Sequence, residues 1–574
     1  MSDIERLLDV IRRGEGHRLS RRDLFKLSAA GTVGAAGMTL LPACGPTDAE
    51  SQGTATMGST SAPTGAASGG ATPAATGSPQ ATGSPGAGTG EGRPGGTLTV
   101  ATPAEAPSLE PHLESADVRT RRTVLLYENL VYLDNDLVPQ PQLAEDWDQT
   151  DDTTFVFKLR RGITFHNGKE LDAEDVKYSY ERLISPDVGS PGRGDLIMID
   201  SIETPDKYTV RFKLKYPFAA FLAALGGRYS AVIPKDYVVN GDELRFTAVG
   251  TGPFMVESWE RNQQLVLKKN PNYWQSGRPY LDQLIIQIIP DETNTVAALR
   301  TGELDMAIFE DPQFYLLVEN EPNLVAQRYP AIRWDVFDMA CDMKPTDDPR
   351  VRKAILLALD KPAIAQAATQ GIATVIGGLP PAMSLFAAPM DQLPNQERDL
   401  EQARFLLREA GYPDGVEVTL RTITSLPTLV ASAQAIEANL REAGITARIE
   451  PVELGVWISD FNAKQFPPTM NGWGGFTDPD LAYYRHFHPE PEGEDFRRWR
   501  NQQAGQLLDE GRRAYDLERR QQIYFDFQTL VAEDVPSIPL YSADIPVVCQ
   551  PKVKGYVQHP SGWYYGFKDT WIEE

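Results

Sequence analysis

An abrupt change of composition near Gly96 limits where a folded domain can begin in this chain. Residues 45–95 consist almost entirely of Gly, Ala, Ser, Thr and Pro, with four charged residues and no aromatic residue. Such a segment cannot bury enough apolar surface to offset the conformational entropy lost on ordering. We therefore expect a disordered tether over 44–95, with a root-mean-square reach of roughly 40 Å, and folded structure from Gly96 onward.

The first 43 residues have the pattern of an export signal. A twin-arginine sequence, SRRDLFK, occupies 20–26 and is followed by an apolar run over 27–43 that ends in Leu-Pro-Ala before Cys44. That run is too short and too rich in Gly and Ala for a good membrane span. The pattern predicts a twin-arginine lipoprotein signal peptide over 1–43, with Cys44 as the lipid-attachment residue. The alternative is an amphipathic N-terminal helix with a chance cysteine.

The net charge limits the kinds of partner, and the cysteine content limits the number of disulfide bonds. The chain of 574 residues has a formal net charge of -24, which argues against nucleic acid as a partner. Beyond Cys44 the only cysteines are Cys341 and Cys549. Two thiols could form one disulfide but do not make a disulfide framework.

From the export signal and the tether, we expect an exported protein that is held at a membrane surface and faces the periplasm or the cell exterior.

The residue pattern changes along the folded part. Residues 153–160 and 207–214 alternate apolar and polar side chains, as half-buried strands do, and 173–184 has helical spacing. These segments predict a small α+β unit. From Asp291 onward, longer helices are expected.

The later helices are marked by caps and stops. Asp348-Pro349 suits a helix start, and 397–412 ends at a glycine that suits a helix stop. Residues 416–422, 427–443 and 446–454 have the pattern strand, helix, strand, which predicts a βαβ unit in a largely parallel sheet. A last helix is expected over about 516–533, before Pro536.

Catalytic signatures are missing from the sequence. There is no phosphate-binding GxxxxGK[ST], no GxSxG, no HExxH and no CxxC. His486 and His488 would face one side of a strand and are the best metal candidates, although solvated or hydrogen-bonded histidines are the simpler interpretation. Asp478 and Asp480 form a carboxylate pair, but in so acidic a chain spacing alone does not mark a catalytic pair. We predict no catalytic residue, no metal and no cofactor.

The most informative loop is 471–480, NGWGGFTDPD. Gly472 and Gly474 flank Trp473, so the backbone could approach a ligand closely while the indole forms a flat apolar wall. The alternative is a glycine-rich loop over the core with a buried tryptophan.

A series of short motifs follows one another along the chain. They are SLEPH (108–112), QLAEDW (142–147), LRRGITFHNG (159–168), EDV (174–176), GTGPF (250–254), NPNYW (270–274), ALRTGELD (298–305), RVRKA (350–354), EAGYPDG (409–415) and IPLY (538–541). In this order they resemble the extracellular solute-binding proteins, family 5, the substrate-binding lipoproteins of peptide- and nickel-type ABC importers. Each motif is weak alone, but together they are specific and cover about 96–574.

The resemblance implies an α/β fold with an α+β subdomain: two lobes of the type II periplasmic-binding-protein kind, joined by a hinge. We map lobe I onto 96–130, 250–335 and 542–574, the extra subdomain onto 131–249, and lobe II onto 336–541. A solute that binds the closed arrangement best would shift the population toward it.

The resemblance also implies site residues. Trp473 matches the family's motif tryptophan, with Gly472 and Gly474 beside it. In peptide-binding relatives an aspartate three residues further pairs with the ligand's amino group; that position is Phe476 here, and Asp478 is the candidate substitute. An arginine three residues before the tryptophan, found in some relatives, is Met470 here.

Further cleft residues follow from the same family pattern. Ser115, Ala116 and Asp117 match an edge loop that should line the cleft, and Tyr541 matches a ligand-side tyrosine near the hinge. Because a buried unpaired ammonium group is unfavourable, a free peptide would need Asp478 to supply the anchor that Phe476 lacks.

The leading hypothesis is a monomeric binding lipoprotein that delivers peptides or peptide-sized solutes to an ABC permease and its ATPase. Aromatic residues without charged anchors would also suit an oligosaccharide or another uncharged solute. An exported hydrolase that uses acidic residues such as Asp478 and Asp480, and a binding protein repurposed as a sensor or chaperone, are the alternatives from other classes.

Overall fold

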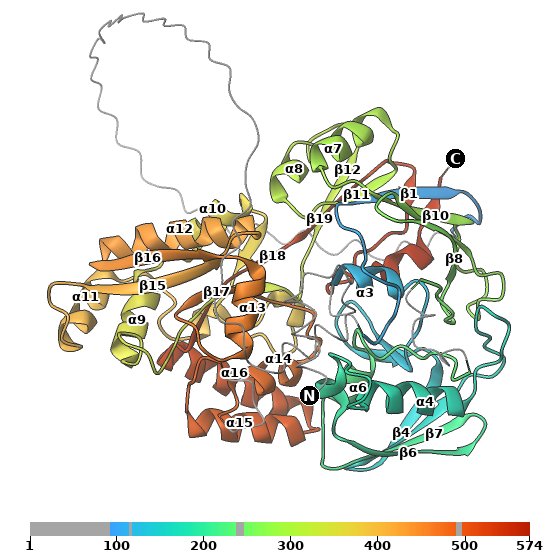
Figure 1. Cartoon of the computed structure of the whole chain (residues 1–574), viewed down its shortest axis with the longest axis horizontal. Coiled ribbons are helices and arrows are strands. Elements are labelled where there is room, and N and C mark those ends of the chain that lie inside the picture. Colours follow the sequence, from blue (N-terminus) through green and yellow to red (C-terminus); the bar gives the residue numbers. More distant parts are fainter. Residues whose placement is uncertain (1–91, 114–116, 237–245, 490–495, 574) are drawn as a thin grey trace, which may run out of the picture. The chain divides into compact units, whose positions relative to one another are not determined.

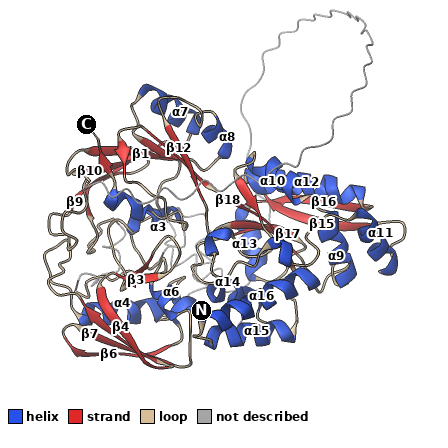
Figure 2. Cartoon of the chain, turned by 180° about the vertical axis from the view of Figure 1, so that it is seen from behind, coloured by secondary structure: helices blue, strands red, loops and turns tan. Residues whose placement is uncertain are grey.

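The computed structural model describes residues 92–113, 117–236, 246–489 and 496–573. Their strands form two large sheets, one four-stranded sheet and two short two-stranded pairs (Figures 1 and 2). The predicted signal peptide, Cys44, and the tether up to residue 91 lie outside the described residues. Among the described residues, no helix combines the length and the apolar character needed to cross a membrane.

The seven-stranded sheet is built from segments far apart in sequence. Strand β1 pairs in parallel with β10 and β11, whereas the other pairings are antiparallel. In order across the sheet the strands are β12 (Val325–Tyr329), β19 (Ile545–Cys549), β11 (Met306–Ile308), β1 (Thr97–Thr102), β10 (Gln283–Ile288), β9 (Gln264–Lys269) and β8 (Phe254–Glu260). The helices in this part of the sequence are α3 (Asp117–Thr123), α7 (Glu292–Thr301) and α8 (Pro312–Leu316).

The six-stranded sheet contains the predicted βαβ unit. Strands β15 (Val416–Ile423) and β16 (Ile445–Val452) pair in parallel along their full length, joined by helix α12 (Pro427–Glu442). Helices α10 (Lys361–Thr369) and α12 lie on one side of these strands, and α9 (Pro349–Ala358) and α11 (Leu400–Glu409) on the other (Figures 1 and 2). The βαβ prediction is confirmed.

The expectation of a largely parallel sheet is wrong. Strand β17 (Thr469–Trp473) is parallel to β15, but β13 (Trp334–Asp338) pairs antiparallel with both β17 and β18 (Ser537–Ala543). Strand β14 (Ala373–Val375) is also antiparallel to β18. These strands enter from distant segments, so no local crossover sets their direction.

The helix starts and stops follow the local signals. The Asp348 side chain accepts a hydrogen bond of 2.8 Å from the Arg350 amide at the start of α9. Gly411, just beyond α11, has φ of +93°, a left-handed conformation that glycine adopts without steric cost. The remaining helices of this part are α13 (Leu454–Asn462), α14 (Pro479–Phe487), α15 (Gln502–Arg513) and α16 (Leu517–Asp534), with 3-10 turns η2 (Pro381–Met383) and η3 (Met390–Gln392).

The α+β unit is an antiparallel sheet with helices on it. The order is β4 (Ala144–Asp151), β5 (Thr154–Leu159), β7 (Thr209–Leu214) and β6 (Ile199–Asp206). Helix α4 (Ala173–Ile184) begins with a capping box in which Asp172 and Asp175 bind each other's backbone amides. The unit also holds α5 (Arg193–Leu196) and α6 (Phe221–Leu225), so the predicted strands and helix are confirmed.

The other elements are short. Strands β2 (Val131–Leu133) and β3 (Pro139–Pro141) form one pair, and β20 (Val553–Lys554) and β21 (Trp571–Ile572) form another, next to the 3-10 turn η4 (Tyr564–Asp569). Cys341 and Cys549 form no disulfide. Cys549 belongs to β19 of the seven-stranded sheet, whereas Cys341 follows β13 of the six-stranded sheet.

The chain passes between the two large sheets at two neighbouring places. Residues 330–333 join β12 to β13, and Asp544 joins β18 to β19. The Ser542 hydroxyl donates hydrogen bonds to the backbone oxygens of Ala331, at 3.1 Å, and Arg333, at 2.7 Å. The two crossings are thus tied side by side.

Candidate functional site

The loop 474–478 connects β17 to α14 and, together with the end of β17, carries five of the predicted site residues: Gly472, Trp473, Gly474, Phe476 and Asp478. Trp473 is the last residue of β17, and Asp478 caps α14 by accepting a hydrogen bond of 2.8 Å from the Asp480 amide. Gly475 has φ of +76°, a left-handed conformation that favours glycine. Trp473, Gly474 and Phe476 are half-buried, and Gly472 is exposed. The sharp turn therefore leaves backbone and aromatic surface accessible at one end of the sheet.

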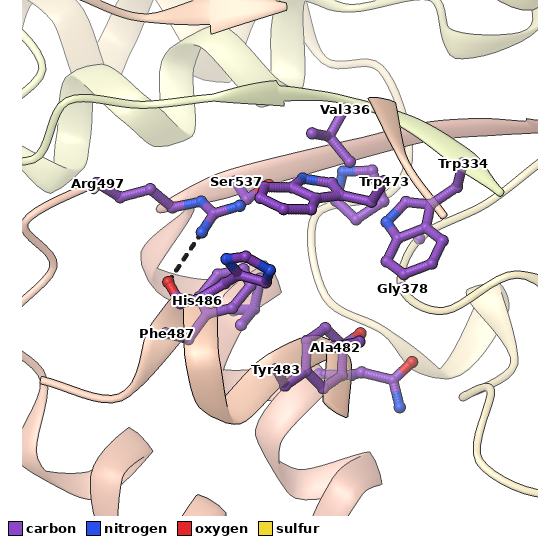
Figure 3. Close-up of a pocket in the computed structure, with 14 residues that line it drawn as sticks. Trp334, Val336, Gly378, Trp473, Ala482, Tyr483, His486, Phe487, Arg497 and Ser537 are labelled. Carbon is purple, nitrogen blue, oxygen red and sulfur yellow. Dashed lines mark hydrogen bonds between the residues drawn. The ribbon is translucent and has the colours of Figure 1, made fainter. Parts of the chain in front are cut away.

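Aromatic side chains gather behind the loop. The Trp473 ring lies 4.1 Å from the His486 ring, 5.6 Å from Phe496 and 6.3 Å from Phe476, measured between centroids. Trp334 of β13 lies 6.4 Å from Phe476. Figure 3 shows Trp473 and Trp334 facing His486, Phe487 and Tyr483 of α14 across a small cavity.

The cavity holds about 20 Å³, which is room for roughly one water molecule. It is mostly apolar, and its lining includes Trp473 and His486 together with Gly377 and Gly378. Both ring nitrogens of His486 are buried without a hydrogen-bond partner among the described residues. Burial, with the charges of Arg497 and Arg485, lowers the pKa of His486 well below its usual range. The ring is therefore neutral near pH 7.

A buried ion pair lies beside the cavity that Trp473 lines. The guanidinium of Arg497 donates a hydrogen bond of 2.7 Å to Asp338 in β13, and both side chains are fully buried. The Ser537 hydroxyl donates to the same carboxylate at 2.6 Å. Arg497 also donates to the backbone oxygen of His486 at 3.0 Å (Figure 3). This network ties β13 and β18 to α14.

Asp478 at the end of the loop and Asp480 in the first turn of α14 each pair with a different arginine. Asp478 accepts two hydrogen bonds from Arg520 of α16, at 2.6 and 2.8 Å. Asp480 accepts two from Arg512 of α15, at 2.9 and 3.0 Å. Burial raises the pKa of Asp480, and Arg512 opposes that shift. Neither carboxylate lines the cavity, so the arrangement is that of structural ion pairs rather than a facing acid and base.

The strand register places Asp335 between two predicted site residues. Asp335 of β13 is opposite Gly472 of β17 on one side and Tyr541 of β18 on the other. Tyr541 is fully buried, and its hydroxyl lies 2.9 Å from the Ser432 hydroxyl. Tyr541 also hydrogen-bonds Asp335, whose pKa is raised by burial. The structure does not place Tyr541 in the cavity lined by Trp473.

Two arginines lie against the glycines of the loop, and sequence reasoning missed both. A Cβ placed on Gly475 would stand 3.1 Å from Nη1 of Arg228, which follows α6. A Cβ on Gly472 would stand 3.6 Å from Nη2 of Arg333, at the crossing between the sheets. Neither arginine belongs to a periodic pattern. The single local signal is the Gly226-Gly227 pair before Arg228.

The histidines at 486 and 488 do not converge. They lie on α14 and at its C-terminal cap rather than on a strand. His486 contacts Trp473, whereas the His488 ring stacks on Tyr484 at 4.4 Å. In the part of the chain that the structure describes, no group of three or more His, Cys, Asp or Glu side chains could hold a metal ion.

The edge-loop residues are only partly described. Asp117 begins α3 and forms an ion pair of 3.1 Å with Arg121. Ser115 and Ala116, like Cys44, lie outside the described residues. Met470 is fully buried in the core of the six-stranded sheet.

Hydrogen bonds connect the α+β unit directly to the segments around the loop. Thr477 donates to the backbone oxygen of Ala223 at 3.3 Å. The Ala219 amide donates to the backbone oxygen of Arg512 at 2.8 Å, and the Phe218 amide donates to the Tyr515 hydroxyl at 3.1 Å. The loop therefore faces the segment 218–228 across a narrow junction.

Comparison with known proteins gives one consistent family. The family model described as "Bacterial extracellular solute-binding proteins, family 5 Middle" matches residues 138–494. A glutathione-binding protein, GsiB, of Salmonella paratyphi A is 30% identical over 456 residues, covering 77% of this chain and 88% of the relative.

Two solved structures show the same fold. The DppA protein of Helicobacter pylori in complex with the peptide STSA is 28% identical, with a TM-score of 0.71 over 84% of this chain and 99% of that one. The oligopeptide-binding protein AppA of Bacillus subtilis in complex with a nonapeptide is 26% identical, with a TM-score of 0.72 over 84% and 100% of the two chains.

Proposed function

The chain belongs to the bacterial extracellular solute-binding proteins, family 5, and we propose that it captures peptides or peptide-sized solutes for an ABC importer. The predicted family and the predicted two-lobed α/β fold are confirmed. Relatives of this chain include a glutathione-binding protein, and two of the related solved structures are complexes with peptides. A permease and its ATPase are the partners that such a role requires.

We propose the lobes as mapped from the sequence: lobe I over 96–130, 250–335 and 542–574, and lobe II over 336–541. The sheet memberships support this division, since the seven-stranded sheet draws on the first set of ranges. The six-stranded sheet draws on the second, with β13 and β18 each reaching two residues further. The crossings at 330–333 and at Asp544 are the proposed hinge.

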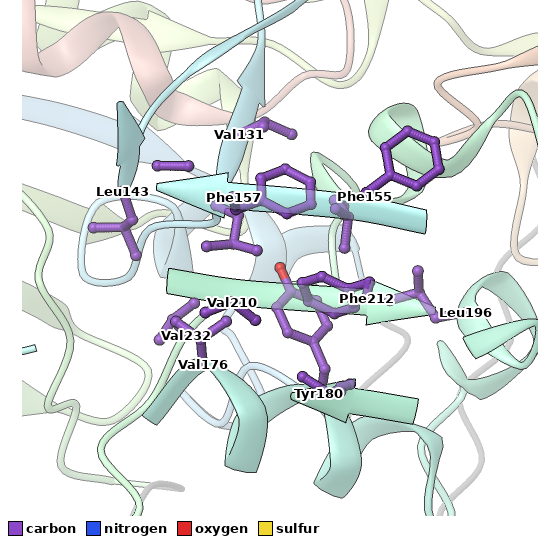
Figure 4. Packing of buried hydrophobic residues seen from close by; sticks show 14 of the residues in the cluster. Val131, Leu143, Phe155, Phe157, Val176, Tyr180, Leu196, Val210, Phe212 and Val232 are labelled. Atoms are coloured by element: carbon purple, nitrogen blue, oxygen red, sulfur yellow. The ribbon is translucent and has the colours of Figure 1, made fainter. Parts of the chain in front are cut away.

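The region 131–249 is the proposed extra subdomain, because it has a hydrophobic core of its own. Phe157 and Phe212 meet edge to face at 5.5 Å, and Tyr180 meets Phe212 at 5.3 Å, between β5, β7 and α4 (Figure 4). Such a core lets the subdomain act as a rigid body on which lobe II closes.

The observation that carries the site assignment is the position of the 474–478 loop. Half-buried Trp473 and the bare backbone of Gly474 and Gly475 stand where lobe II meets the segment 218–228. An indole and an exposed backbone are the groups that a solute-binding cleft offers to a peptide or a sugar. Gly472, Phe476 and Asp117 complete the proposed surface, with Ser115 and Ala116 beside them.

An uncharged or non-peptide solute is a second candidate. The position three residues beyond Trp473 is Phe476, and both carboxylate oxygens of Asp478 are engaged by Arg520. Asp478 could bind a peptide's amino group only if that pair opened. Tyr541 acts, in this proposal, through Asp335 rather than by direct contact with solute.

We further propose that residues 1–43 direct twin-arginine export, and that Cys44 carries a lipid that tethers a monomeric domain beside the membrane through residues 45–95. The order of the three sequence signals supports this. Replacing Cys44 with serine should release the exported protein from the membrane fraction while leaving solute binding intact.

The function is tested by thermal unfolding of the purified chain against a panel of peptides, oligosaccharides, sugar phosphates and metal complexes. A solute that binds only the folded state raises stability by about 2.7 kcal/mol at a hundred times its Kd. We expect at least one class of small solute to raise the Tm. A panel that leaves the Tm unchanged throughout would contradict the proposal.

A further inference from the structure

We propose that the solute bears an anionic group, a carboxylate or a phosphate, and that Arg228 and Arg333 bind it from the two sides of the Gly474-Gly475 turn. This inference rests on the proposed function and names the substrate class of the same site. It depends on where these two guanidinium groups lie and on what surrounds them.

Arg228 comes from the subdomain. The Cβ position of Gly475 lies 3.1, 3.5 and 3.9 Å from Nη1, Cζ and Nε of Arg228. The guanidinium group therefore lies along the backbone of the turn. It also lies 5.0 Å from the Tyr229 ring, and its charge acts on Arg119. Arg228 is half-buried, and the glycine carries no side chain that could cover it.

Arg333 comes from the crossing between the sheets. Its Cβ and Cγ lie 3.3 and 3.4 Å from the Cβ position of Gly474, and its Nη2 and Nε lie 3.6 and 3.9 Å from that of Gly472. The side chain thus runs along the loop beside Trp473 and is exposed. A side chain at Gly472 or Gly474 would crowd this path.

The donors of both groups have no carboxylate acceptor among the described residues. No hydrogen bond or ion pair within the described ranges involves the guanidinium group of Arg228 or Arg333, in contrast to the bidentate pairs of Arg512 and Arg520. The positive charge of Arg333 opposes the rise in the pKa of Asp335, which Tyr541 hydrogen-bonds, and helps to lower the pKa of Glu310, which pairs with Arg121.

These arginine donors are open although the chain has a formal net charge of -24. A third guanidinium group, that of Arg485 on α14, adds positive potential at Tyr229 and His486. Guanidinium groups offer forked donors that match the two oxygens of a carboxylate or a phosphate. An anion placed at the turn would connect the subdomain, through Arg228, to the hinge, through Arg333.

The test uses matched pairs of small solutes on the purified full-length chain. One arm compares tripeptides that have a free C-terminal carboxylate with their C-terminal amides. The other compares sugar phosphates with the corresponding neutral sugars. We expect the anionic member of one pair to raise the Tm more than its neutral partner, and the arm that responds identifies a carboxylate or a phosphate as the anion.

The variants Arg228→Gln and Arg333→Gln should each weaken binding of that solute by about 10- to 100-fold, the loss expected for a hydrogen bond to a charged group. Arg228→Lys, which keeps the charge, should recover part of the loss. The control Arg519→Gln alters an exposed arginine of α16 that pairs with Glu510 and should bind like the original chain. The solute-free Tm of each variant reports whether it is folded.

Three outcomes overturn the inference. If only the neutral compounds of the pairs stabilise the protein, the proposed solute-binding function is kept, but the inference that the solute is an anion is wrong. Anion binding that is unchanged in a folded Arg228→Gln, Arg333→Gln double variant removes the two arginines. Absence of stabilisation by any compound of either arm, or of the wider panel, removes the proposed function and this inference together.

Discussion

Arg520 on α16 donates two hydrogen bonds to Asp478, at 2.6 Å to Oδ1 and 2.8 Å to Oδ2, with both side chains only 7% exposed. The pair joins the candidate ligand loop to helix α16. Because Asp478 also caps α14, one carboxylate fixes the end of the loop to both α14 and α16. The loop beside Trp473 is therefore a preorganised element.

Breaking this pair should be strongly destabilising. Arg520→Met leaves the Asp478 carboxylate buried without its partner, so we expect the free energy of unfolding to fall by about 3–5 kcal/mol. Denaturant unfolding of the solute-free protein measures this. Arg519→Met, which removes an exposed pair with Glu510, should cost less than about 1 kcal/mol. Equal losses of stability in the two variants would show that the buried pair stabilises the protein no more than the exposed pair does.

A side chain at Gly475 should leave the protein folded but weaken its binding of solute. Gly475→Ala introduces a Cβ 3.1 Å from the mobile end of Arg228 at φ of +76°. Gly302→Ala is a matched control, with φ of +77° and nothing within 4 Å. Both should lose about 1 kcal/mol of stability from the left-handed backbone.

Only Gly475→Ala should also weaken solute binding, by about tenfold, because it displaces the Arg228 guanidinium group. Isothermal titration calorimetry with a solute found by the thermal screen makes the comparison. Unchanged affinity in Gly475→Ala would argue against an arginine at the turn as a ligand contact.

His486 should contribute to the loss of stability in acid. Its pKa is well below 6.5 in the folded protein, so the unfolded chain binds more protons below about pH 6.5, and stability falls as the pH decreases from that point. His486→Phe removes this effect. As the pH falls from 6 to 5, the free energy of unfolding of the variant should rise relative to that of the original chain by up to about 1.4 kcal/mol per pH unit.

The other histidines do not affect the difference in stability between the His486→Phe variant and the original chain. Burial lowers the pKa of His112 to about 3 and that of His559 to about 4, but both are present in the two proteins and cancel in the difference. Urea unfolding at several pH values gives the result. Parallel stability curves would mean that His486 is protonated in the folded state, against its buried position.

Trp473 should contribute to solute affinity more than a comparable tryptophan elsewhere. Loss of its ring in Trp473→Leu removes an accessible aromatic wall, and we expect the Kd of a stabilising solute to rise about tenfold. Trp571→Leu alters another half-buried tryptophan, in β21, and should leave the Kd unchanged. A Kd that is insensitive to Trp473→Leu would place the solute away from this loop.

Local signals predicted the helices and several strands well. The helix expected over 173–184 is α4 with the same bounds, and the helix expected over 427–443 is α12, Pro427–Glu442. Caps such as Asp348 and stops such as Gly411 act within a few residues of the helix end. Periodicity and capping chemistry are therefore readable from the chain, as was the resemblance of ordered motifs to one family.

Long-range partners were not predictable in this way. No pattern in the sequence indicates that Asp478 pairs with Arg520, or that β13 and β18 run antiparallel beside the βαβ unit. The burial of Tyr541 against Ser432 and the approach of Arg228 to Gly475 are likewise contacts between distant segments. Tertiary packing alone decides them, because the energy of an ion pair or a close contact depends on which groups the folded chain brings together and how much water it excludes.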